Sequence, residues 1–297
     1  MEVATMPVWG VKALAVGSGV VVSAVVVAVM LAVAPTQVAV AAVIVLAVVV
    51  AVANHRACEA LAAAVMLRAR RLRPSERDEL AAVLTELCRV GLGPPLVELR
   101  VKRSRAIGAL GVGRRTVVVS TGLIEAVVLG DLPSRQAAAV VAHSAVLVRE
   151  GLTRADLLIG CVSAPWRAMR AAVRGICRCG RRLPFTQAAW RLRAIVVAVA
   201  VVQAVQLGQF GLATTVGSIG ALSYALPAWE HRWRDLLVRT GDEGVVQAGL
   251  GDGLVEFLRQ CPSSDATSAR LRALVLPAVR RPASGRPVVL RGAPDAR

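Results

Sequence analysis

His143 is the residue whose type and setting most suggest chemistry in this chain of 297 residues. It lies in an apolar run from Arg135 to Glu150, which we predict to be a helix because Asp131-Leu132-Pro133-Ser134 is typical of a helix start. A lone histidine on an apolar helix face is more often a packed core residue than a metal ligand. A functional role for His143 therefore needs partner residues.

Candidate partners occur in two places. Glu150 follows His143 by seven residues on the same helix face, about 10.5 Å further along the axis, so the two side chains could not easily share one ion. Glu230, His231 and Asp235 follow a later apolar block and could approach the helix only in an unusual register. Neither place supplies a clear second ligand.

The segments before His143 follow a recognisable order. Thr116–Ser120 is β-branched over its first four residues and predicts a strand, and the short helix Leu123–Leu129 follows the step Thr121-Gly122. Leu132 to Gln136 then begins the helix that carries Ala142-His143. The run from Arg115 to Leu158 resembles the core of the HtpX-like membrane zinc metallopeptidases, relatives of the CAAX prenyl proteases.

The resemblance implies a zinc site whose residues are mostly missing here. In the family, two histidines one helical turn apart and a distant Glu bind Zn²⁺, and the Glu after the first histidine is the general base. Here His143 keeps the first ligand position, Ser144 stands at the base position, and Leu147 and Val238 stand at the lost ligand positions. Leu and Val cannot coordinate a metal, and Ser is no effective general base at neutral pH.

The resemblance and these replacements predict a degenerate family member, a pseudoprotease. We expect no cofactor, although the family binds zinc, and we expect protein clients or an active protease relative as partners. Whether the chain is an enzyme stays open. Two alternatives remain: an active zinc metalloendopeptidase with relocated ligands, and a membrane-anchored regulator that uses an arginine-rich surface.

Apolar residues make up 56% of the chain and fall in blocks. Val11–Ala34 and Val38–Ala53 flank Pro35-Thr36-Gln37 and predict a transmembrane hairpin in a lipid bilayer, and Ala194 to Ala228 predicts a second hydrophobic hairpin that could turn at its glycines. The arginines that follow Ala53 place the N-terminus and the main domain in the cytoplasm of a bacterial-type plasma membrane.

The expected fold is a mainly α membrane protein with a gluzincin-type α+β cytoplasmic domain and a small sheet. Its predicted parts are an N-terminal transmembrane hairpin (1–56), a cytoplasmic peptidase-like domain (57–193), the second hydrophobic hairpin (194–228), the C-terminal part of the peptidase-like domain (229–262) and a disordered basic tail (263–297).

The formal net charge is +17, and nearly all of the positive charge is Arg. Nucleic acid is an unlikely partner because no aromatic residues alternate with the basic ones, as binding of a single strand requires. The six cysteines have spacings that fit neither a disulfide framework nor a zinc site, so free thiols are expected.

Overall fold

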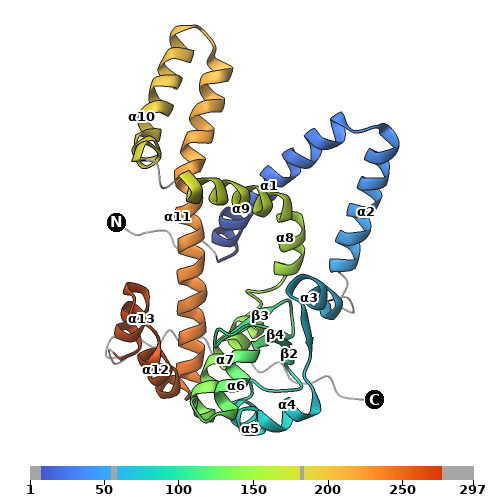
Figure 1. Cartoon of the computed structure of the whole chain (residues 1–297), viewed down its shortest axis with the longest axis vertical. Helices are drawn as coiled ribbons and strands as arrows, with labels where there is room; N and C mark the ends of the chain where they lie inside the picture. The colour runs from blue at the N-terminus through green and yellow to red at the C-terminus, as the bar shows by residue number, and fades with distance from the viewer. Residues whose placement is uncertain (1–7, 55–58, 181–183, 276–297) are drawn as a thin grey trace.

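Helices make up most of this computed structural model, which describes residues 8–54, 59–180 and 184–275. The elements run in the order α1 (Val8–Val33), α2 (Thr36–Asn54), α3 (Glu59–Leu67), β1 (Ala69–Arg71), α4 (Pro74–Glu79), α5 (Ala81–Arg89), β2 (Glu98–Lys102), β3 (Ala109–Val112), β4 (Thr116–Ser120), α6 (Thr121–Val128), α7 (Ser134–Arg149), α8 (Asp156–Val162), α9 (Ala164–Gly180), α10 (Pro184–Gln206), α11 (Phe210–Gln247), α12 (Gly251–Gln260) and α13 (Asp265–Val275). Figure 1 shows the sheet and α4–α7 at the lower end, with the helix pairs α1–α2 and α10–α11 extending away from it.

The sheet has four strands in the order β1-β2-β4-β3. β2 and β4 pair in parallel, with Glu98 opposite Thr116, whereas β1 and β3 each pair antiparallel with their neighbour. Every residue of β4 is buried, because helices cover both faces of the sheet. Val117 and Val119 belong to the main core, and Val118 on the other face packs in a small cluster with residues of α3 and β1.

Helix α7 is the centre of the main core, and 12 of its 16 residues are buried. It packs against α5, α11 and α12 and against strands β3 and β4. The helix ends at Arg149, and Gly151 just beyond it has a φ of +72°, which favours glycine. Gly151 N donates to Val148 O and Leu152 N to Leu147 O, which closes the end of the helix. This ending sets the position of the loop that follows α7.

The apolar block from Ala194 to Ala228 contains a helix reversal. α10 ends at Gln206, and α11 starts at Phe210 and packs back along it. Gly208 has a φ of +72°, and Gln209 N donates to Ala204 O, which closes the last turn of α10. The chain therefore turns at one of the glycines in this block, and α11 then continues for 38 residues toward the sheet.

The prediction of a membrane protein was wrong. No helix in the described part of the chain has the length and apolar character needed to cross a bilayer. This finding overturns the transmembrane hairpin, the membrane fold class and the plasma-membrane location. The prediction counted apolar residues, but α1 also contains Lys12 and Ser23, both buried, and it packs against α9 and α11.

Two other segments differ from the sequence prediction. The composition of residues 263–297 predicts a disordered tail, whereas Asp265–Val275 forms helix α13; residues 276–297 lie outside the described part. The amphipathic pattern of Ser75 to Val90 predicts one helix, but the chain bends at Leu80 between α4 and α5. The predicted strand at Thr116–Ser120 is confirmed, as is the predicted helix around His143.

Candidate functional site around His143

His143 lies near the middle of α7, where α11 crosses it. Gly241 of α11 packs against its ring: a Cβ added there would lie 2.1 to 2.7 Å from three atoms of the imidazole. Gly244, one turn later, approaches Val146 in the same way. The two glycines let the backbones of α7 and α11 approach closely, so the sequence of α11 determines what meets the histidine.

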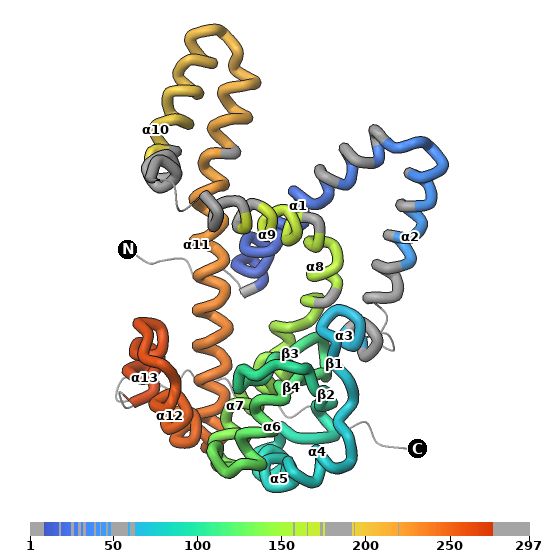
Figure 2. The backbone as a smooth tube through the Cα atoms, viewed as in Figure 1, coloured from blue at the N-terminus to red at the C-terminus, as the bar shows by residue number. Residues whose placement is uncertain are grey.

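An ion pair lies beside the imidazole. Asp242 follows Gly241, and its Oδ1 is 3.6 Å from His143 Nδ1. Arg270, from α13, donates from Nε to Asp242 Oδ2 at 3.0 Å and from a terminal nitrogen to Oδ1 at 2.6 Å. The carboxylate nearest to His143 is thus bound on both oxygens by a guanidinium, which is a strong and directional arrangement. Figure 2 shows the helices α7, α11 and α13 that bring these three residues together.

The imidazole of His143 is held neutral. Burial lowers the pKa of His143 below its ordinary value; the Asp242 carboxylate raises it and the Arg270 guanidinium lowers it further. Its Nδ1 atom is buried and has no hydrogen-bond partner. A neutral ring suits a metal ligand, but it suits a packed core histidine equally well.

The other predicted site residues lie around this ring without completing a metal site. Ser144 is buried, and Leu147, one turn after His143, is 9% exposed. Val238 is half-buried on α11, one turn before Asp242. The structure therefore brings the α7 and α11 segments together, and Leu147 and Val238 on them are both aliphatic.

The proposed substitute ligands are too far away to help. Glu230 precedes Gly241 by 11 residues on one continuous helix, which places it about 16 Å away along the axis. Its carboxylate pairs with Arg170 and with Arg234. Glu150 is exposed at the end of α7 and contacts Arg149. None of these groups can share an ion with His143.

The residues present do not fit a zinc ion. Zinc in proteins takes Cys, His, Asp or Glu ligands, three or four to a site. Among residues 8–54, 59–180 and 184–275, no group of three or more such side chains is close enough together to hold a metal. A zinc ion next to His143 would also lie beside the Arg270 cation. The expectation that the protein carries no cofactor stays a prediction.

Arg270 is the residue of this site that the sequence analysis missed. It lies in the segment predicted to be disordered, yet a local signal was present: Ser264 Oγ accepts a hydrogen bond from Thr267 N, which caps the first turn of α13. Leu271 and Leu274 then recur at helical spacing and pack against the main core. A helix start followed by this spacing could have placed Arg270 in an ordered element.

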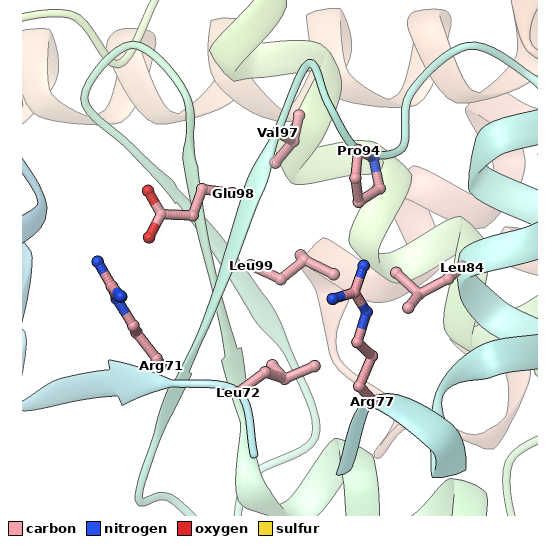
Figure 3. Close-up of a pocket in the computed structure, with 8 residues that line it drawn as sticks. All are labelled: Arg71, Leu72, Arg77, Leu84, Pro94, Val97, Glu98 and Leu99. Carbon is pink, nitrogen blue, oxygen red and sulfur yellow. The ribbon is translucent and has the colours of Figure 1, made fainter. Parts of the chain in front are cut away.

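A cavity also lies elsewhere in the fold. It has a volume of about 340 Å³ and lies where β1 and β2 meet α4 and α5 (Figure 3). Leu72, Leu84 and Leu99 form its apolar side, and the guanidinium of Arg77 points toward them in the close-up. No residue of α7 or α11 lines this cavity, so it is separate from the site around His143.

Comparisons with protein-family models, with curated proteins and with solved structures find no match for this chain.

Proposed function

We propose that this chain is a non-catalytic protein built on a metallopeptidase-like core, and that it binds extended segments of unfolded protein clients. The observation that carries the proposal is the Asp242–Arg270 ion pair beside His143. In a working metallopeptidase, that space serves a metal and its activated water. Here the Arg270 guanidinium binds both oxygens of the Asp242 carboxylate beside His143, and Leu147 and Val238 stand where ligands would be needed.

The edge of the sheet supports a binding role. β3 is an outer strand that pairs only with β4 among the described strands, so one of its edges can accept another extended chain. Leu110 on this strand is 53% exposed, and Ile107 just before it is 43% exposed. A client strand could pair with the backbone of β3 and cover Leu110. The opposite side of β3 packs against α7, the helix of His143.

The first test measures binding and cleavage of one unfolded protein. The purified chain should bind reduced and carboxymethylated ribonuclease, which cannot refold, and leave it intact over many hours. Leu110→Lys should weaken this binding about tenfold, because it removes the burial of one leucine side chain and blocks the strand edge with a charge. Fluorescence anisotropy with a labelled client gives the affinities, and gel electrophoresis reports cleavage.

Leu129→Lys is the matched control. It makes the same change of charge and size as Leu110→Lys, but Leu129 lies outside the strand, at the end of α6, where it is 74% exposed. Equal affinities for the two variants would refute the role of β3. Elemental mass spectrometry tests the other half of the proposal. About one zinc per chain, lost in His143→Ala and accompanied by client cleavage, would establish the active metallopeptidase instead.

A further inference from the structure

Four arginines line a second cavity, of about 220 Å³, at the C-terminal end of α7. Arg114 and Arg115 come from the turn between β3 and β4, Arg149 from the end of α7, and Arg154 from the loop that follows it. Leu92 and Val148 contribute apolar surface. His143, Asp242 and Arg270 do not line this cavity, so it is a separate site.

The positive charge of this cavity is poorly balanced. The side chains of Arg114, Arg115 and Arg154 make no ion pair or hydrogen bond within the described part of the chain, and Arg149 reaches only Glu150, at 3.7 Å. The Glu59 carboxylate also lies at the turn, where it accepts hydrogen bonds from the backbone. All four arginines are exposed, and together they give the cavity a positive potential that attracts an anion.

The turn that carries two of the arginines is held in place. Glu59 Oε1 accepts hydrogen bonds from the backbone nitrogens of Arg114, at 2.8 Å, and Arg115, at 3.1 Å. Gly113 has a φ of +68°, and a Cβ there would overlap the Glu59 side chain. The backbone of the turn is therefore fixed by its contact with α3.

The loop that carries Arg154 is fixed from two sides. Thr153 Oγ1 donates to Gly113 O at 2.6 Å, which joins this loop to the turn between β3 and β4. Lys12, from α1, donates to the carbonyl oxygen of Arg154 at 2.8 Å. The backbone under the arginines is thus ordered before any ligand binds, which lowers the entropic cost of binding.

We propose that this cavity binds a small ligand with a diphosphate group. The planar guanidinium fork matches the oxygens of phosphate and can donate two hydrogen bonds to one group. Four such side chains can neutralise a ligand with two or three negative charges. The volume is below the range of about 300–1,000 Å³ typical of drug-sized ligands, which favours a compact anion, and Leu92 and Val148 can contact its organic part.

Isothermal titration calorimetry on the full chain tests this proposal with inorganic pyrophosphate, ADP and a single-stranded 12-mer oligonucleotide. We expect saturable binding of pyrophosphate or ADP. Tighter binding of ADP would identify an organic diphosphate as the ligand class, and equal binding would identify the inorganic diphosphate. Absence of saturable binding of both would overturn the proposal, as would an oligonucleotide that binds more tightly than either.

The variant Arg114→Gln/Arg154→Gln should weaken binding of pyrophosphate by about 100-fold, because each lost guanidinium contact accounts for about tenfold. Arg103→Gln/Arg232→Gln is the matched control: both arginines are exposed, neither lines the cavity, and the net charge changes equally. Retained binding in the control supports a built site. If both variants bind pyrophosphate equally weakly, the loss of affinity comes from the change in net charge, and the proposal is refuted. Circular dichroism confirms that both variants fold.

Discussion

At the scale of single residues, His143 is a partly buried histidine whose contacts within the described part of the chain are those of a packed core residue. Its ring packs against the backbone of Gly241, and its Nδ1 is buried without a hydrogen bond. The neighbouring carboxylate, that of Asp242, is paired with Arg270. Each of these contacts is structural. The histidine therefore contributes packing between α7 and α11.

The burial of His143 predicts a pH dependence of stability. Because burial lowers the pKa of His143 in the folded state, the unfolded chain, with an ordinary pKa of about 6.5, takes up the proton first. Wild type should therefore lose free energy of unfolding, relative to His143→Gln, as the pH falls below about 6.5, by at most about 1.4 kcal/mol per pH unit. Urea unfolding of both proteins between pH 8 and pH 5 measures the difference.

A difference that does not change with pH would mean that the imidazole is not protected from protonation. A difference that grows in favour of the wild type at low pH would mean that the protonated ring pairs with Asp242, 3.6 Å away. Either result would contradict the interpretation of His143 as a neutral, packed histidine.

At the scale of elements, the contact between α7 and α11 depends on glycine. Gly241→Ala should reduce the free energy of unfolding by about 2 kcal/mol, because the added methyl group would overlap the His143 ring in a packed core. Gly217→Ala, on the same helix, meets only Val201 at 3.6 Å and should raise stability by about 0.5–1 kcal/mol through helix propensity. Chemical denaturation compares the two variants with wild type.

If Gly241→Ala lowers the free energy of unfolding and Gly217→Ala raises it, the close approach of α7 is what requires glycine at position 241. A general sensitivity of α11 to alanine would instead lower the stability of both variants. A neutral Gly241→Ala variant would mean that α11 can move away from α7. In that case, the Asp242–Arg270 pair would not be fixed beside His143.

The sequence predicted the elements that depend on local signals. Thr116–Ser120 is β-branched and forms β4, and the residues around Pro133 begin α7 as expected. The contacts between distant segments could not be predicted in the same way. Arg270 reaches Asp242 across 28 residues, and the membrane prediction counted the apolar run of α1 without the partners of Lys12. Local pattern does not encode which surface an apolar helix meets.

At the scale of the whole molecule, Lys12 joins three regions that are far apart in the sequence. It is 4% exposed on α1, and its Nζ donates to Leu152 O at 2.6 Å and lies 2.7 Å from Asp156 Oδ1. The ring centres of Trp9 and of Trp233, on α11, lie 5.6 Å and 5.5 Å from the ammonium, within range of cation–π attraction. One charge thus connects α1, α11 and the loop after α7.

Lys12→Met should therefore destabilise the protein by about 3 kcal/mol, because it keeps the aliphatic packing but leaves buried carbonyl groups and Asp156 without their cation. The loss should be concentrated in the contacts of α1, so hydrogen exchange should accelerate there and in residues 151–156 before it does in β4. Lys12→Met/Asp156→Asn separates the ion pair from the carbonyl contacts: it should regain part of the lost stability. Unchanged exchange in α1 of Lys12→Met would mean that helix packing alone holds α1 in place, and that Lys12 does not connect the three regions.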